Sequence, residues 1–303
     1  MRNLPREDQH DGQVKSFKVL KFHGLGNDYL IIEKNPSPPT PRQVVLLCDR
    51  NHGVGGDGLL VRVPTSHADY GLQIHNPDGS IAEISGNGLR IFAHWLHHQH
   101  DAPARFTVAT GGRVVGCEVD GDEVEVAMGQ ASFEPAQVPV QLPSPMIDAP
   151  LPTEIAGAGG PVLRATAVGL GNPHCVMFFE QDLDELPWRE WGACIERHTL
   201  FPNRTNVQFA RVLSPDHVEI RIHERGAGPT LASGSSACAV AAAALETGRT
   251  GPVVRVQAPG GTLSVRIGPS WQLQLRGPVE AVGHFEPADT FLARWQAAAP
   301  LQP

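Results

Sequence analysis

Two loops that lead into apolar helices hold most of the polar residues whose types could do chemistry. The first loop contains HNPDG at 75–79 and SGNG at 85–88, and the second contains HERG at 223–226 and SGSS at 233–236. A helix that begins at a small polar residue and a glycine presents unpaired N–H groups and the positive end of its dipole to a ligand. Each loop therefore predicts an anion site, and two such sites facing one cleft would suit a small molecule that carries a carboxylate.

Further polar side chains in the same Gly-rich segments could orient such a ligand. Asparagine also favours turns, because it tolerates left-handed backbone and bonds its own chain, so each has a purely structural explanation as well. A surface ion pair is the alternative for Glu224 and Arg225, and a core position is the alternative for His174. The candidates are Asn27, Asn76, Asn87, Asn172, His174, Asn206, Glu224 and Arg225.

Nucleotide chemistry is disfavoured, because no G-x-G-x-x-G follows a predicted strand with an acidic residue about 20 positions later, and no Walker A motif is present. The net charge of −8 argues against nucleic-acid and anionic-membrane partners. No apolar run approaches the roughly 20 residues that span a bilayer, and residues 1–15 lack the apolar core of a signal peptide. We therefore expect a cytoplasmic protein. Its five cysteines are irregularly spaced, and they form neither a disulfide framework nor a zinc motif.

An internal repeat organises the chain. GLGN at 24–27 recurs at 169–172, and DR at 49–50 is echoed by ER at 196–197. His75 precedes a Ser-Gly pair by ten residues, as His223 does 148 positions later. Four matches in the same order at offsets of 145 to 148 residues predict two homologous domains related by a pseudo-twofold axis. Equivalent loops would then face each other across a cleft.

Hydrophobic periodicity predicts mixed α/β structure in both halves. Expected helices begin at Thr40-Pro41 and cover 86–98, 183–198 and 234–247. Expected strands cover 17–22, 29–33, 58–63, 70–75, 105–109, 113–119, 123–128, 161–168, 175–179, 207–213, 217–223, 253–258, 261–267 and 271–277. The proline-rich segment 133–152 connects the halves. We predict a flexible tail at 1–16, an N-terminal domain of 17–128 plus 277–303, and a C-terminal domain of 129–276.

Seven segments in order resemble the diaminopimelate epimerase family. They are FHGLGNDYLII (22–32), CDRNHGVGGDGLL (48–60), HNPDGSIAEISGNGLRIFAHWL (75–96), GLGNPHCV (169–176), HTLFPNRTNVQF (198–209), HERGAGPTLASGSSACA (223–239) and APGGTL (258–263). The resemblance implies two α/β domains, each a curled mixed sheet or barrel around a central helix. It also implies cofactor-independent and metal-free interconversion of LL- and meso-diaminopimelate, an amino-acid substrate, and a homodimer.

The resemblance also assigns residues to the substrate. It implies that the side chains of Asn27, Asn76, Asn172, Asn206, Glu224 and Arg225 hold the amino acid. It implies that the amides of Gly86, Asn87, Gly234 and Ser235 bind its α-carboxylate.

Members of this family use two cysteines on opposite faces of the α-carbon, and here both positions are serine: Ser85 and Ser233. A thiol has a pKa of roughly 8.5, whereas an unassisted hydroxyl lies near water's roughly 15.7. A gap of up to about 7 units corresponds to on the order of 9 kcal/mol. A helix dipole recovers only about 0.3–2 kcal/mol of this difference. An alkoxide therefore cannot simply replace the thiolate. Two further positions differ from the family. Pro229 stands where the family usually has an acidic residue, and Gly58 stands where some members have a glutamine.

Three interpretations of the serines compete. In the first, the chain is an inactive or slow epimerase. In the second, it is a divergent isomerase of another carboxylate, in which His174 and Glu224 move protons and Ser85 and Ser233 act as relays. In the third, it is an active enzyme that carries two engineered substitutions. A binder of a small amino acid is the non-enzymatic alternative. Such a binder would keep the amides that hold the carboxylate and would lose the acid–base pair.

Overall fold

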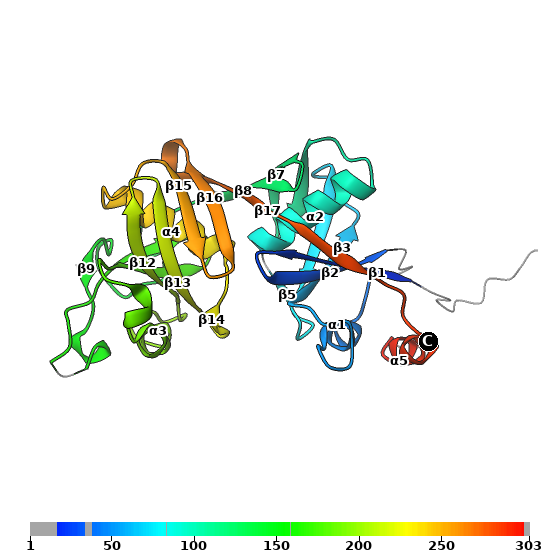
Figure 1. The fold of residues 1–303 in the computed structure, drawn as a ribbon, viewed down its shortest axis with the longest axis horizontal. Helices are drawn as coiled ribbons and strands as arrows, with labels where there is room; N and C mark the ends of the chain where they lie inside the picture. The colour runs from blue at the N-terminus through cyan, green and yellow to red at the C-terminus, as the bar shows by residue number, and fades with distance from the viewer. Residues whose placement is uncertain (1–16, 34–37, 83, 158, 300–303) are drawn as a thin grey trace, which may run out of the picture.

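The computed structural model describes residues 17–33, 38–82, 84–157 and 159–299, so the predicted tail at 1–16 lies outside it. The chain forms two lobes (Figure 1), and in each lobe a curled sheet surrounds one helix. Within the described residues, no helix is both long and apolar enough to cross a bilayer. The fold is the mixed α/β arrangement that the sequence predicts, and the part of the chain that the structure describes has eighteen strands joined in one sheet.

The first lobe is built from the first ten elements of the chain. They are β1 (Lys18–Gly24), β2 (Asn27–Glu33), α1 (Pro41–Cys48), β3 (Gly58–Val63), β4 (Tyr70–His75), β5 (Ile81–Ala82), α2 (Gly86–Gln99), β6 (Arg105–Thr110), β7 (Arg113–Asp120) and β8 (Glu123–Gln130).

The second lobe follows a largely irregular connection. Its elements are β9 (Ala149–Pro150), the 3-10 turn η1 (Thr153–Ile155), β10 (Arg164–Gly169), β11 (Pro173–Phe178), η2 (Leu183–Glu185), α3 (Trp188–Glu196), β12 (Asn206–Ser214), β13 (His217–Glu224), β14 (Gly228–Thr230), α4 (Gly234–Glu246), β15 (Val253–Ala258), β16 (Gly261–Ile267), η3 (Pro269–Trp271) and β17 (Gln272–Pro278). The chain then returns to the first lobe as β18 (Glu280–Phe285) and α5 (Asp289–Ala297).

Strand pairing repeats between the lobes. In the first lobe β2 pairs with β3 and β4 with β6 in parallel, and in the second β11 pairs with β12 and β13 with β15 in parallel. The remaining pairs within each lobe are antiparallel. Two antiparallel pairs link the C-terminal part of the chain to the first lobe: β17, the last strand of the second lobe, pairs with β8, and β18 pairs with β1. The domain boundaries themselves stay a prediction.

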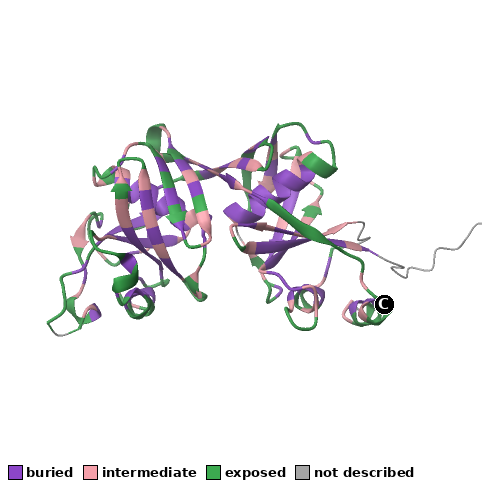
Figure 2. Cartoon of the chain, in the orientation of Figure 1, coloured by how far each residue is buried: buried purple, intermediate pink, exposed green. Residues whose placement is uncertain are grey.

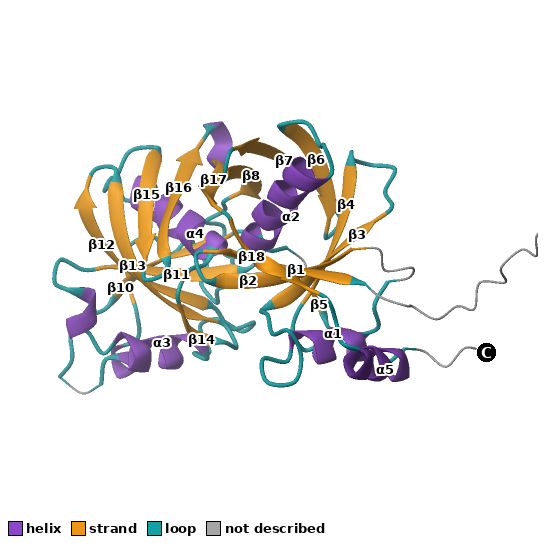
Figure 3. Ribbon diagram, turned by 45° about the vertical axis from the view of Figure 1, so that its right-hand side comes forward, coloured by secondary structure: helices purple, strands orange, loops and turns teal. Residues whose placement is uncertain are grey.

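Helices α2 and α4 occupy the centres of the lobes, where Figure 3 shows strands around them and Figure 2 shows them buried. The helix α2 begins at the N-cap Ser85, whose hydroxyl accepts from the amide of Gly88. The helix α4 is rich in alanine, which combines high helix propensity with little volume and so fits inside a closed sheet. Both belong to the main hydrophobic core.

One predicted helix was wrong, and two elements near the C-terminus were missed. The helix predicted at 183–198 is divided into η2 and α3 at Pro187, since proline restricts the preceding residue to extended backbone. β18 was missed because all of its residues are exposed, so it shows no alternation (Figure 2). α5 was missed because it buries only Leu292 and Trp295.

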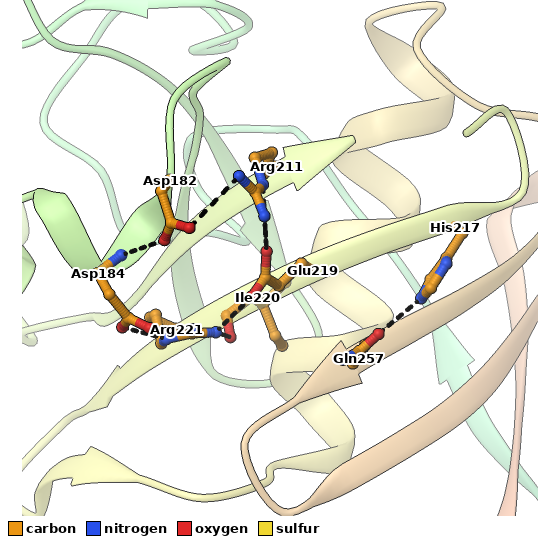
Figure 4. Close-up of polar contacts among 8 residues, drawn as sticks. All are labelled: Asp182, Asp184, Arg211, His217, Glu219, Ile220, Arg221 and Gln257. Atoms are coloured by element: carbon orange, nitrogen blue, oxygen red, sulfur yellow. Dashed lines mark hydrogen bonds and ion pairs between the residues drawn. The ribbon is translucent and has the colours of Figure 1, made fainter. Parts of the chain in front are cut away.

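The outer face of β12 and β13 carries an ion-pair network (Figure 4). Glu219 accepts from Arg211 at 2.7 Å and lies 3.1 Å from Arg221. Arg221 also pairs with Asp184, the middle residue of η2, at 2.7 Å. The network therefore ties the 3-10 turn to the sheet. It lies on the outside of the second lobe and contributes nothing to the interior surface on which polar side chains of both lobes meet.

Candidate active site

A cavity of about 620 Å³ lies between the lobes, in the size range of small-molecule sites. Both repeats contribute to its wall. The lining residues that carry polar groups or helix ends are Asn27, Tyr29, Arg50, Asp57, Asn76, Ser85, Gly86, Asn87, Asn172, Glu224, Thr230, Ser233, Gly234 and Ser235. Ten of the thirteen residues that the sequence nominated are among them; His174, Asn206 and Arg225 are not.

The N-termini of α2 and α4 meet at this cavity. Ser85 and Ser233 are the two N-caps, and both have extended backbone. A Cβ atom added to Gly234 would lie 3.6 Å from the Cα of Gly86 and 2.7 Å from a methyl of Leu275. The two helix ends are therefore within van der Waals reach of each other, and a side chain on Gly234 would require Leu275 to move. Two sets of unpaired amides and two helix dipoles are thus directed at one place, which favours a carboxylate.

The hydroxyl of Ser85 lies against a phenol. Tyr29 donates to the Oγ of Ser85 at 3.0 Å, and burial raises the pKa of Tyr29 to about 12. A Cβ atom at Gly58 would lie 2.7 Å from the Cε1 of Tyr29 and 2.5 Å from the carbonyl oxygen of His75. Gly58 therefore makes the room that the phenol occupies, and a glutamine at this position would displace Tyr29 from Ser85.

The hydroxyl of Ser233 lies against a carboxylate instead. Burial raises the pKa of Glu224, and hydrogen bonds from Ser233 and Thr230 oppose that shift. Ser233 also lies 3.5 Å from the hydroxyl of Ser235. The two N-cap serines consequently have different partners. One contacts a group that stays protonated, and the other contacts a group that can accept a proton.

A chain of side-chain hydrogen bonds fixes the amides on the first-lobe wall. Arg90 donates to the oxygen of Asn87, Asn87 donates to the oxygen of Asn27 at 3.0 Å, and Asn27 donates to Asp57 at 2.8 Å. Arg90 is fully buried, and burial lowers its pKa to about 10. Because every member donates toward Asp57, the orientation of both asparagines is determined by a cation at one end and a carboxylate at the other.

A second cation closes the opposite end of that chain. Arg50 contacts Asp57 at 2.6 Å and Asp28 at 2.7 Å, and Lys21 contacts Asp28 at 2.8 Å. Burial alone would raise the pKa of Asp28, but hydrogen bonds from Arg50 and Lys21 lower it to about 2. Arg50 lines the cavity, so it adds positive charge beside the asparagines.

His174 lies behind the cavity wall. Its Nε2 lies 3.0 Å from the oxygen of Asn172, its Nδ1 lies 3.0 Å from the amide of Gln208, and burial lowers its pKa to about 3. A ring that stays neutral and uses both nitrogens in this way orients Asn172, which does line the cavity. This geometry does not place His174 where it could move a substrate proton.

Asn206 and Arg225 also lie outside the lining. Asn206 donates to the carbonyl of Pro173 at 3.1 Å and accepts from the backbone amide of Arg225 at 3.0 Å. The guanidinium of Arg225 is exposed and donates to the carbonyl of Asn203. Asn76 does line the cavity, and its amide donates to Ser80.

Sequence reasoning did not nominate Tyr29, Arg50, Asp57 or Thr230. Two signals were present: Arg50 stands in one copy of the repeated acid–arginine pair, and Asp57 adjoins Gly58. Tyr29 carried no signal, because an aromatic residue in a predicted strand is explained by the core alone.

Known proteins resemble this chain over nearly its whole length. The family model for diaminopimelate epimerase matches residues 19–134 and 166–281, as two copies offset by 147 residues. The diaminopimelate epimerase of Synechococcus elongatus is 39% identical over 276 residues, covering 88% of this chain and 96% of that protein. The diaminopimelate epimerase of Pelotomaculum thermopropionicum is 40% identical over 273 residues, covering 86% and 95%.

Solved structures share the fold at low sequence identity. A hydroxyproline epimerase from Agrobacterium vitis with bound trans-4-hydroxy-L-proline aligns with a TM-score of 0.64 at 15% identity, covering 95% of this chain and 99% of that one. A phenazine biosynthesis protein of the PhzF family from Bacillus anthracis aligns with a TM-score of 0.68 at 14% identity, covering 91% and 100%.

Proposed function

Because this chain belongs to the diaminopimelate epimerase family, we propose that it is an isomerase that inverts one α-carbon of diaminopimelate, interconverting the LL and meso forms without a cofactor. The observation that carries the proposal is the meeting of two serine-capped helices at one cavity. The amides of Gly86, Asn87, Gly234 and Ser235 bind the α-carboxylate there. The negative charge that develops when the α-proton leaves is stabilised by the same dipoles.

Proton removal is assigned to Ser233 together with Glu224. The Ser233 hydroxyl takes the α-proton while it passes its own proton to the Glu224 carboxylate, so no free alkoxide forms. Burial raises the pKa of Glu224, which makes this carboxylate a stronger base than an exposed one. The arrangement avoids most of the cost of on the order of 9 kcal/mol that an unassisted serine would face.

Proton return is assigned to Ser85 together with Tyr29. The Ser85 hydroxyl gives its proton to the opposite face of the α-carbon and recovers one from the phenol at 3.0 Å. Solvent then restores Tyr29 and Glu224 to their starting protonation states. The slow step is the proton transfer from the phenol to Ser85, because a phenol with a pKa of about 12 holds its proton strongly.

Deuterium incorporation tests the proposal. The unaltered protein is incubated with LL-diaminopimelate in D2O, and α-deuteration is followed by NMR. We expect slow exchange that is lost in Glu224→Gln, and faster exchange in the double variant Ser85→Cys, Ser233→Cys. If the double cysteine variant does not exchange either, the substrate assignment is wrong.

Binding of an amino acid without turnover is the second candidate function. It is favoured by one observation, namely that both proton-transfer positions carry hydroxyls while the helix ends that hold a carboxylate are intact. Two results together would select this candidate. The unaltered protein would bind diaminopimelate in a calorimeter without deuterating it, and the double cysteine variant would deuterate it. A cytoplasmic location and a homodimer stay predictions.

A further inference from the structure

The end of α2 that lies away from the cavity carries a cluster of metal-binding side chains. His94 and His98 are four residues apart, so they lie on the same face of the helix. Asp122, in the turn between β7 and β8, faces them. One ligand atom from each of the three residues lies within 4.8 Å of the others. The segment 94–100 holds four of the chain's histidines, so two of them stand outside this cluster.

Those two histidines have other contacts. His97 lies 2.7 Å from the carbonyl of Ala102 through its Nδ1, and His100 lies 3.7 Å from Glu33 through its Nε2. Their side chains account for the local structure around the end of α2. His94, His98 and Asp122 instead converge on one another, with one ligand atom of each within 4.8 Å of the others.

The nitrogen of His94 that can bind a ligand is identified by burial. Its Nδ1 is buried, whereas its Nε2 lies 3.4 Å from the Oδ1 of Asp122. That separation exceeds the usual 2.7–3.2 Å of an N–H···O hydrogen bond. It equals the edge of about 3.4 Å that two ligands form around a tetrahedral ion with bonds of about 2.0–2.1 Å.

The third side chain can close the site by rotation. His98 is exposed, and its ring already lies 4.3 Å from the ring of His94, centroid to centroid. The backbone carbonyl of Gly121 is 3.1 Å from the Nε2 of His98, so the turn that carries Asp122 lies beside the ring. A cation here also meets the negative end of the α2 dipole.

We propose that His94, His98 and Asp122 form a binding site for a divalent transition ion, with Zn²⁺ as the preferred occupant and water as the fourth ligand. Two imidazoles and one carboxylate suit zinc, nickel or copper, whereas magnesium and calcium require oxygen ligands. The site is independent of the proposed epimerase activity. His98 is twelve positions after Gly86 in the same helix, which is roughly 18 Å along the axis.

The ion joins two elements that both reach the cavity. α2 begins at Ser85, and β8 carries Met128, which lines the cavity wall. Zinc bound to α2 and to the turn before β8 would hold these elements together at their far ends. The role of the ion is therefore structural, and it raises the stability of the folded state by mass action.

Zinc titration of the full chain, freed of any affinity tag and stripped with a chelator, tests the site. We expect one ion per chain by calorimetry, and a rise in Tm. Loss of a direct ligand in His98→Ala or Asp122→Asn should weaken binding by more than ~100-fold, since even changes behind the ligands cost about 10–100-fold. Both residues are exposed, so both variants should fold. His67→Ala, an exposed histidine in the loop before β4, is the matched control.

Cobalt(II) provides the second measurement. A tetrahedral d–d spectrum without a thiolate charge-transfer band supports histidine and carboxylate ligands and excludes the exposed Cys194 as a ligand. Unchanged stoichiometric binding in both His98→Ala and Asp122→Asn overturns the proposal. So does the absence of stoichiometric binding to the unaltered protein.

Discussion

The phenol of Tyr29 lies 3.0 Å from the hydroxyl of Ser85, and it does so because Gly58 has no side chain. Two departures, serine at a position where the family implies cysteine and glycine where some members have glutamine, are therefore parts of one arrangement. In this chain the first-lobe serine has a proton donor behind it, and the second-lobe serine has the carboxylate of Glu224.

Replacing Tyr29 with phenylalanine removes the donor and keeps the ring. We expect α-deuteration of diaminopimelate to fall by about 10²–10⁴-fold, the usual contribution of a positioned acid or base. Binding of the substrate should be nearly unchanged, because Tyr29 contacts Ser85 and leaves the helix-end amides free. Tyr70→Phe, in β4, is the control. Equal exchange rates in the two variants would remove Tyr29 from the mechanism.

Glu224→Gln should lower activity and raise stability. Burial raises the pKa of Glu224 in the folded protein above its value of about 4.5 in the unfolded chain. The folded state is therefore penalised once the pH exceeds the unfolded pKa, and the penalty is complete above the folded pKa. Below the unfolded pKa there is no penalty. The glutamine variant should therefore have the higher Tm at pH 7 and the same Tm in acid. Exchange by the unaltered protein should increase as the pH rises through the folded pKa. Glu219→Gln, on the outer face of the second lobe, should change exchange little.

Asp28→Asn should destabilise the protein by about 2 kcal/mol at pH 7, because a carboxyl whose pKa is about 2 in the folded protein and 3.8 in the unfolded chain favours folding above the higher value. This contribution is lost as the pH falls through about 2. Denaturant unfolding of both proteins at pH 7 and in acid measures the difference. Asp101→Asn, at an exposed position, should be neutral. A pH-independent difference would contradict the ion-pair explanation.

Gly277→Ala tests how tightly Arg90 is enclosed. The added Cβ atom would lie 2.3 Å from the Nη1 of Arg90 and 2.4 Å from a methyl of Leu263. We expect a loss of about 1–3 kcal/mol in unfolding free energy, typical of overpacking. Displacement of Arg90 should also weaken substrate binding through Asn87. At Gly116 an added Cβ would meet nothing within 4 Å, so Gly116→Ala should be neutral or slightly stabilising.

Repetition in the sequence made much of the fold predictable. The two GLGN turns, the two Ser-Gly helix starts and the offset near 147 residues anticipated the two lobes. The helix break at Pro187 and the exposed strand β18 were missed. Strand β18 is defined by its pairing with β1, in which partners are 257 to 266 positions apart in sequence, and no local pattern reports such a contact.

Prediction of the site was strongest for backbone positions and weakest for side-chain partners. Gly86 and Gly234 follow from the helix-start pattern, and the structure brings them together. His174 looked like a candidate for proton transfer, but its environment depends on Gln208, which comes from a neighbouring strand. Tyr29 and Ser85 are 56 residues apart, so only the folded sheet shows that they form a pair.

The pairing of β1 with β18 and of β8 with β17 also governs the order of assembly. During translation β1 is synthesised long before its partner β18, so one edge of the first lobe's sheet stays unpaired until the end of the chain has been made. Contacts at such sequence separations slow folding and expose unpaired strands to aggregation. Deletion of residues beyond 278 should therefore impair the folding of the lobe that is synthesised first.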